Sequence, residues 1–382
     1  MSPSHRLSPA SFLRHASDVA SFYGFHPARE YERIAQNRLA KRRGAHSFDA
    51  VVAVCATCVS LRPAEPVLAY YATPSPSHLP HSFAARETGE FGLQVVGSPE
   101  SVGEVVLIKT AAAIITEWGA QIARVRINAL GDRDSQQRFL RELSLYLRKR
   151  QNDLDETCRE SVAGNPLSAY ACMHERCRAV LAEAPRSMNF LSEKSRAHFR
   201  SVLEHLENLG LPYELDDLLL GDERDPHLSF AIDLAEGEAT VLGARAGRFD
   251  DYLKRVSGRR EGTGVAASIY FRKKGASRSS FSALPLRRAP KVYFVQLGLR
   301  AKLQGLTVLD QLRAARIPAA QSFDATHLSP QLVAAKELGV SYALIMGQRE
   351  ALDGTVIVRH MQDSSQQTIS VTALPRFLKT LR

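Results

Sequence analysis

The sequence lacks any long uninterrupted apolar run. Its longest candidate, residues 102–118, is interrupted by Glu104, Lys109 and Glu117, so it does not reach the length needed to cross a bilayer. The first six residues, Met1-Ser-Pro-Ser-His-Arg, also lack the apolar segment of a secretion signal. We therefore expect a cytoplasmic protein with no membrane partner.

Cysteine is scarce, with five residues in 382, and an odd number in a chain without a secretion signal indicates reduced thiols. The pairs Cys55-x-x-Cys58 and Cys172-Met-His174-Glu-Arg-Cys177 have spacings from which a zinc site can be built. The first pair, however, lies in an apolar stretch, residues 51–61, that predicts a buried strand, where free cysteines behave as small hydrophobes. Spacing without a matched second pair is weak evidence, and we expect no metal.

Acidic residues are fewer than basic ones, 40 against 50, which gives a net charge of +10. This excess is compatible with a nucleic-acid partner and equally with a merely basic protein. A length of 382 residues allows two or three domains with proper cores. The 45% of apolar residues excludes wholesale disorder.

A glycine-bearing stretch, residues 241–253, is followed by a second small-residue segment, residues 264–269. Together they predict an antiparallel sheet whose backbone approaches a ligand or another strand closely, because Gly243, Gly247 and Gly264 carry no Cβ. Other predicted elements precede this sheet: a helix over 8–23 with Ser8 as N-cap, strands over 51–61, 91–97 and 123–129, a helix over 102–118 capped from Ser98, and helices over 137–150, 166–183 and 193–209.

The composition changes after this sheet. Residues 271–291 hold seven basic residues, no acidic residue and two prolines, a composition typical of a linker. Strands and helices then alternate with short loops to the end of the chain, which predicts a small α/β domain with helices on both faces of a sheet.

This last domain resembles the anticodon-binding domain of histidyl-tRNA synthetases, through the strand before Gly298, residues 336–347 and residues 354–359. Upstream, short motifs similar to those of the family follow in the same order: Leu61-Arg-Pro63, Leu79-Pro80, Gly92-Leu-Gln-Val-Val-Gly97, Ile127-Asn-Ala-Leu-Gly-Asp132, Leu154-Asp-Glu156, Asn165-Pro-Leu167, Leu211-Pro-Tyr-Glu214, Ala246-Gly-Arg-Phe-Asp250 and Gly264-Val-Ala-Ala-Ser-Ile269. Each motif alone is weak, but their common order is strong.

The resemblance implies an α+β fold. Residues 1–271 are expected to form a class II synthetase-like antiparallel sheet core, with a helical insertion at about 135–209. A basic linker over 272–290 and an anticodon-binding-like α/β domain over 291–382 are expected to follow. The resemblance also implies a homodimer formed through the core.

The catalytic motifs of the family depart from this pattern. The family places three arginines around the α-phosphate of ATP, where guanidinium forks stabilise the developing charge. Here Arg86 lies in an interval too short for the usual motif 2 loop, Arg224 is flanked by two acids and followed by Pro226, and Arg272 falls one residue late. A shift of one residue in a strand moves a side chain to the opposite face.

Amino-acid recognition is also eroded. Gln94 stands where the family has the carboxylate that binds the substrate ammonium, and Phe249 replaces a tyrosine. The two tyrosines expected around residues 226–229 are absent. We therefore expect no catalytic residue and no cofactor, with ATP and Mg²⁺ needed only if the site is active.

Four residual pocket candidates remain, namely Arg62, Gln94, Arg248 and Asp250. Arg248 is expected either to supply a pocket cation or to form a structural ion pair with Asp250 or with an acid elsewhere in the chain. Arg62 is expected to play one of the same two roles, pocket cation or member of a structural ion pair.

Three functions follow from this resemblance. The first is a non-catalytic paralogue that binds tRNA or another structured RNA, or regulates through it. The second is an active histidine–tRNA ligase with a diverged site. The third is a regulatory subunit similar to the synthetase-related partner of ATP phosphoribosyltransferase, although such subunits typically lack the C-terminal domain found here and need a histidine pocket.

Overall fold

The computed structural model describes residues 8–35, 47–61, 66–79, 83–98, 100–220, 222, 224, 226–236, 239–258, 262–273, 281, 290–321 and 327–381. The core is an eight-stranded sheet that is antiparallel except for its two short edge strands. In spatial order its strands are β1 (His26–Pro27), β2 (Val67–Thr73), β3 (Thr88–Val96), β8 (Gly264–Arg272), β7 (Ala239–Arg248), β6 (Leu228–Glu236), β4 (Ile122–Ala129) and β5 (Glu214–Leu215).

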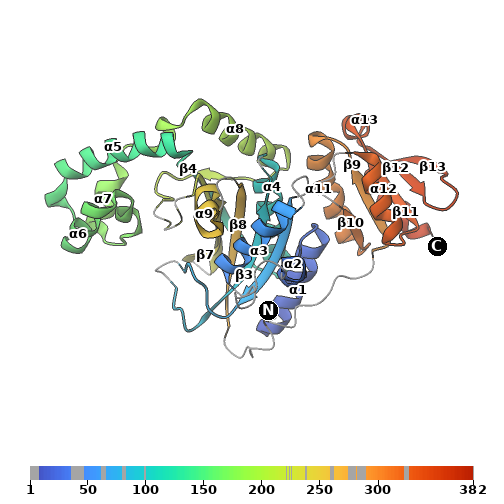
Figure 1. Cartoon of the computed structure of the whole chain (residues 1–382), viewed down its shortest axis with the longest axis horizontal. Helices are drawn as coiled ribbons and strands as arrows, with labels where there is room; N and C mark the ends of the chain where they lie inside the picture. The colour runs from blue at the N-terminus through green and yellow to red at the C-terminus, as the bar shows by residue number, and fades with distance from the viewer. Residues whose placement is uncertain are drawn as a thin grey trace.

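Helices cover both faces of this sheet (Figure 1). On one face lie α1 (Pro9–Phe22) and α4 (Val102–Glu117), against which α8 (Glu193–Asn208) packs. On the other lie α2 (Ala28–Ala35), α3 (Phe48–Leu61) and α9 (Asp250–Ser257). The two faces have separate apolar clusters, because side chains alternate along each strand. Among the described residues no helix is long and apolar enough to cross a membrane.

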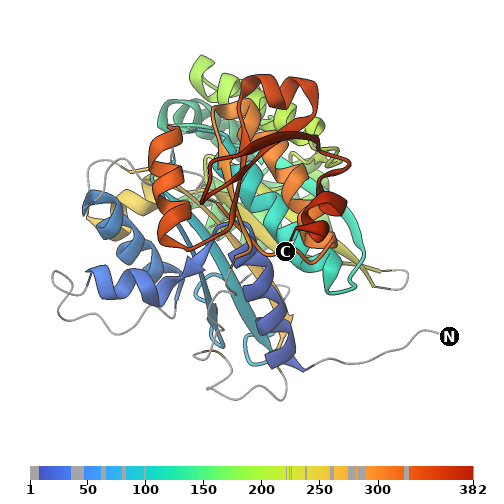
Figure 2. The ribbon, with the colours of Figure 1, turned by 90° about the vertical axis from the view of Figure 1, so that its right-hand side faces the viewer.

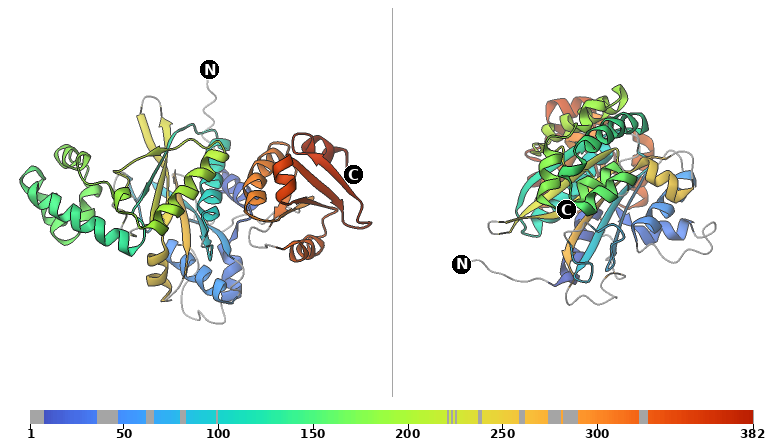
Figure 3. Two further views of the ribbon diagram at one scale, coloured as in Figure 1. Left: turned by 90° about the horizontal axis from the view of Figure 1, so that it is seen from above. Right: turned by 90° about the vertical axis from the view of Figure 1, so that its left-hand side faces the viewer.

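The helical insertion forms an arm that projects from one end of the core (Figures 1 and 3). It consists of α5 (Arg133–Lys149), η1 (Gln151–Asp153), α6 (Glu156–Gly164), η2 (Pro166–Ala171), α7 (Glu175–Ala182) and η3 (Ser187–Phe190). The single helix predicted over 166–183 is therefore wrong, since a short η2 turn and α7 replace it. The arm has its own small apolar cluster around Phe139, Leu143 and Leu147.

The C-terminal domain lies at the other end of the core (Figures 2 and 3). Its sheet has the order β10 (Ala319–Gln321), β9 (Val292–Gln296), β11 (Tyr342–Met346), β12 (Thr355–His360) and β13 (Gln366–Ser370). The helices are α11 (Leu299–Ala314), α12 (Leu328–Glu337), α13 (Gln348–Asp353) and α14 (Leu374–Thr380). Leu306 of α11 and Ala335 of α12 belong to different clusters, so helices cover both faces, as predicted.

Residues 51–61 are helical, and the predicted strand there is wrong. Valine and cysteine favour strands, but a continuous apolar run has no periodicity that separates a buried strand from a buried helix. In α3 the run is buried against the sheet and α9.

The first helix begins as predicted, with Ser8 Oγ accepting from the Ser11 amide and Pro9 at the first helical position. Within the segment 98–101 predicted to cap α4, Ser101 is the N-cap, and its side chain makes no capping bond.

Most of the predicted linker lies outside the described residues. Phe281, within it, is buried and stacks with Phe271 at the end of β8, with ring centroids 6.1 Å apart. This contact holds one point of the linker against the core.

Candidate functional site

A small cavity lies on the sheet face that α3 and α9 cover, next to the predicted pocket residue Gln94. Its walls come from α3, β3, α9 and β8, and include Phe48, Gln94, Phe249, Tyr252 and Ala266. The free volume between them is about 10 Å³, which is room for one water molecule at most. Neither an amino acid nor a nucleotide fits into this space.

Two aromatic rings and an arginine pack together beside this cavity. The rings of Phe48 and Phe249 meet edge to face, with centroids 5.8 Å apart. The guanidinium of Arg224 lies over both, 4.6 Å from the centroid of Phe48 and 4.3 Å from that of Phe249. Only 2% of Arg224 is exposed. Within the described residues, these side chains leave no open space next to the two rings.

The charge of Arg224 is already neutralised. Its Nε and Nη2 donate to the two carboxylate oxygens of Asp222 at 2.8 and 2.7 Å, and Arg245 approaches the same carboxylate at 3.4 Å. Burial by itself raises the pKa of Asp222, but the charges of Arg224 and Arg245 outweigh it and hold the pKa well below the usual range. The Nε/Nη2 edge of Arg224 is therefore already occupied by a carboxylate.

The backbone of this sheet packs closely against its own chain. A Cβ on Gly247 would lie 2.5 Å from the carbonyl oxygen of Leu228, and one on Gly264 would lie 2.5 Å from Leu253. A Cβ on Gly243 would lie 2.6 Å from Leu234. The sequence predicted that these glycines allow the close approach of a ligand or of another strand. The structure shows the close approach of neighbouring strands and side chains.

Gln94 is fully buried and faces the small cavity. Its Nε2 donates to the backbone oxygen of Phe48 at 3.1 Å, and its Oε1 has no hydrogen-bond partner in the structure. Two residues earlier on the same strand face, Gly92 accommodates the ring of Tyr71, which its Cβ would overlap. The amide thus fastens α3 to β3.

Glu90 is a buried carboxylate on this face that the motif comparison missed. Tyr71 Oη donates to its Oε1 at 2.6 Å and Ser268 Oγ at 2.7 Å. Alternation along β3 from Gln94 would have indicated that Glu90 shares its face. Both partners are neutral hydroxyls of the protein itself.

Arg248 lies on the opposite face of β7 from Phe249. Its Nε and Nη2 donate to the two oxygens of Glu104 in α4 at 2.5 and 2.8 Å, and both side chains are buried. His198 Nε2 lies 2.6 Å from the same carboxylate. Of the two alternatives for Arg248, the geometry supports the structural ion pair, chiefly with Glu104.

Asp250 fixes the corner between β7 and α9. Its Oδ1 accepts from the Gly264 amide at 2.9 Å and lies 3.4 Å from Arg248 Nη1. A carboxylate in the first turn of α9 also suits the helix dipole. Its contacts within the structure are those of a structural acid.

The remaining predicted cations do not converge on the pocket. Arg86 is exposed in a tight turn before β3. Arg272 is 86% exposed, and its nearest acid is Glu236 at 3.9 Å. Phe271, at the motif 3 arginine position, packs over Gly89 and against Phe12. Arg62 lies outside the described residues. Within the described part of the chain, Arg224 is the predicted cation that packs on the rings of Phe48 and Phe249.

The Glu104–Arg248 ion pair makes the free energy of unfolding depend on pH in the acid range. Burial raises the pKa of Glu104, but the charge and hydrogen bonds of Arg248, together with His198, lower it to about 2, against 4.5 for a free glutamate. Because the folded-state pKa is depressed, this stabilisation is fully present above pH 5 and is lost as pH falls from about 4.5 to about 2.

We expect the stability gap between the wild type and Glu104→Gln to be largest at pH 7. It should shrink by about 1.4 kcal/mol for each pH unit below 4.5. Urea unfolding at several pH values measures this gap. A gap that stays constant down to pH 3 contradicts the prediction.

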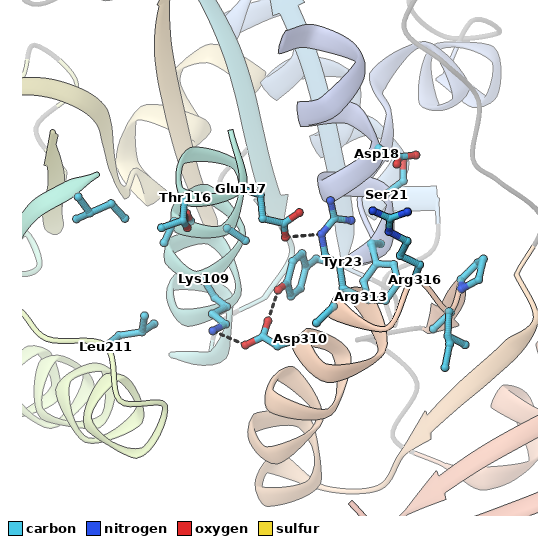
Figure 4. Close-up of a pocket in the computed structure, with 18 residues that line it drawn as sticks. Asp18, Ser21, Tyr23, Lys109, Thr116, Glu117, Leu211, Asp310, Arg313 and Arg316 are labelled. Carbon is cyan, nitrogen blue, oxygen red and sulfur yellow. Dashed lines mark hydrogen bonds and ion pairs between the residues drawn. The ribbon is translucent and has the colours of Figure 1, made fainter. Parts of the chain in front are cut away.

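A larger cleft, of about 840 Å³, lies between the core and the C-terminal domain (Figure 4). Asp310 of α11 accepts from Tyr23 Oη and lies 2.5 Å from Lys109 Nζ, while Arg313 Nε donates to Glu117 at 2.5 Å. The guanidinium of Arg313 also lies over the ring of Phe22. These charged groups pair with one another across the two domains, so they dock α11 against α1 and α4.

Comparison with known proteins agrees with this architecture. Residues 291–381 match the family model described as anticodon binding domain. The histidine–tRNA ligase of Geobacillus thermodenitrificans (strain NG80-2) is 30% identical over 324 residues, which covers 83% of this chain and 75% of the relative. That of Bacillus velezensis is 27% identical over 322 residues and covers 83% and 76%.

Among solved structures, the apo histidyl-tRNA synthetase of S. aureus matches with a TM-score of 0.48 at 19% identity, covering 94% of this chain and 93% of that one. The 30% identity to a histidine–tRNA ligase over 83% of this chain is sufficient to assign the family. The chain belongs to the histidyl-tRNA synthetase (histidine–tRNA ligase) family.

Proposed function

We propose that this family member does not activate histidine and instead binds tRNA or a tRNA-like RNA, directly or as a regulator acting through that RNA. The observation that carries the first half is the small cavity. Phe48 and Phe249 line it, Arg224 lies over both rings, and about 10 Å³ is free among the described residues. A reaction that develops charge on phosphate needs free cations in place, and Arg224 is committed to Asp222.

The second half is supported by the C-terminal domain. Residues 291–381 match the anticodon binding domain. Residues 291–382 hold eleven basic and six acidic residues, so about a quarter of the chain carries half of the net charge of +10. A positive excess gathered in one domain favours phosphate contacts through counterion release. The homodimer implied by the family resemblance is part of the same proposal.

Calorimetry of the purified full-length protein with total tRNA, with histidine and with ATP tests the proposal. We expect tRNA to bind with a Kd tighter than about 10⁻⁵ M at physiological salt, and the logarithm of the affinity to fall linearly with that of the salt concentration. Dividing the slope by about 0.9 gives the number of phosphates contacted. Histidine and ATP are expected to give no heat of binding.

Photocrosslinking to thiouridine-containing tRNA, followed by mass spectrometry, locates the contact. Crosslinked peptides are expected from residues 291–381, and an unstructured RNA of equal length serves as the control. Failure to bind any tRNA, or crosslinks found only in the core, removes the RNA half of the proposal. A saturable histidine site would instead favour the active ligase or the transferase-associated regulator.

A further inference from the structure

Three cysteines of the arm lie together in space. The Sγ atoms of Cys158, Cys172 and Cys177 are all within 4.8 Å of one another. Cys158 comes from α6, Cys172 follows η2 and Cys177 lies in α7. Zn–S bonds of about 2.3 Å in tetrahedral geometry place sulfurs roughly 3.8 Å apart, so small shifts of these side chains suffice to hold one ion.

The surroundings of the cluster suit metal-bound thiolates. Cys158 and Cys177 are buried, at 4% and 0% exposure, and Cys172 is half-buried. The backbone N–H of Asp155 donates to Cys177 Sγ at 3.3 Å. Amide donors to a ligand sulfur are the usual outer support of a metal site. His174 lies between Cys172 and Cys177, half-exposed, with Nε2 3.8 Å from Asp155 Oδ1.

The short helices of the arm also need an additional stabilising link. Helices α6 and α7 are nine and eight residues long, and helices this short are marginal without tertiary packing. The arm projects away from the sheet (Figure 3), and its apolar cluster is separate from those that cover the two faces of the sheet. An ion held by Cys158, Cys172 and Cys177 would join α6, the end of η2 and α7, which is how small domains compensate for a limited core.

We propose that Cys158, Cys172 and Cys177 bind one structural Zn²⁺ ion, with His174 or a water molecule as the fourth ligand. Thiolate sulfur selects zinc over the hard cations magnesium and calcium. A disulfide would pair two of the three thiols and leave the third. Cys55 and Cys58 do not take part, because they lie in α3 in the separate cluster on the sheet.

Elemental analysis of full-length protein, purified with reductant and without a polyhistidine tag, tests the site. We expect about one zinc per chain. The Cys158→Ser and Cys177→Ser variants are expected to lose it, whereas the matched Cys55→Ser/Cys58→Ser variant keeps it. His174→Ala lowers zinc affinity by tenfold or more if the imidazole is the fourth ligand, and leaves it unchanged if water is.

Cobalt substitution of the wild type guards against variants that fail to fold. The expected result is the intense visible spectrum of tetrahedral thiolate-bound cobalt, which zinc displaces. Chelation is expected to expose the three thiols to alkylation and to lower the thermal midpoint. Absence of zinc and of the cobalt spectrum from wild type, or a disulfide between two of the three cysteines in reduced cells, would overturn the proposal.

Discussion

Purified protein supplied with histidine, ATP, Mg²⁺ and labelled pyrophosphate is expected to form labelled ATP no faster than a blank without protein. Each fixed donor at a developing oxyanion is worth about 10²- to 10³-fold in rate, so losing two or more lowers the exchange rate by at least about 10⁴-fold. The cavity beside Phe48 and Phe249 also has only about 10 Å³ of free volume among the described residues, which supports the proposed loss of activity.

The histidine–tRNA ligase of Geobacillus thermodenitrificans, assayed in parallel, is the positive control. Arg224→Ala is the informative variant, since it enlarges the cavity without adding a cation and is therefore expected to stay inactive. Histidine-dependent exchange by the wild type that disappears in Arg224→Ala would show instead that Arg224 is a working catalytic arginine and that the pocket opens around its substrates.

Replacement of Arg248 by methionine is expected to destabilise the core by about 3–5 kcal/mol. The variant leaves Glu104, which has no exposed surface, as a buried charge that keeps only His198. Trp118 is the one tryptophan of the chain and packs against Phe12 beside α4. Its fluorescence during urea unfolding therefore reports on the part of the core that contains the pair.

Two further variants distinguish the loss of the Glu104–Arg248 ion pair from a general effect of removing a charge. Arg349→Ala removes an 88% exposed guanidinium whose partner, Asp353, is 3.6 Å away, and it should change stability by less than about 0.5 kcal/mol. The double variant Glu104→Leu/Arg248→Met should be more stable than Arg248→Met alone, since no buried charge remains. An unchanged unfolding midpoint for Arg248→Met would refute the structural role assigned to it.

Local patterns predicted the elements whose signals are local. The Ser8-Pro9 start of α1, the strand–helix alternation after residue 291 and the glycine-bearing strands β7 and β8 all agree with the structure. The strand predicted over residues 51–61 is wrong because an apolar run of valine and cysteine suits a buried helix as well as a buried strand. The surface against which the run packs decides between the two.

The contents of the candidate site could not be predicted from local patterns. Arg248 meets Glu104 across 144 residues, and the position of a charge in a motif does not say which face of the strand it takes. Arg224 was identified as misplaced, but its position over two rings depends on Phe48, which belongs to the helix mistaken for a strand. The pair Cys172 and Cys177 was noticed, but the third member of their cluster, Cys158, was missed because it stands alone in the sequence.

The packing of Arg224 and Asp222 with Phe48 and Phe249 has a consequence for the evolution of this chain. Arg224, Asp222 and the two phenylalanines stabilise one another, so each contributes to folding. Under the proposal that the reaction is lost, adding one catalytic arginine would not restore activity by itself, and removing Arg224 or either phenylalanine would cost stability without restoring it. A return to activity would then need several substitutions together, because packing opposes each of the single steps.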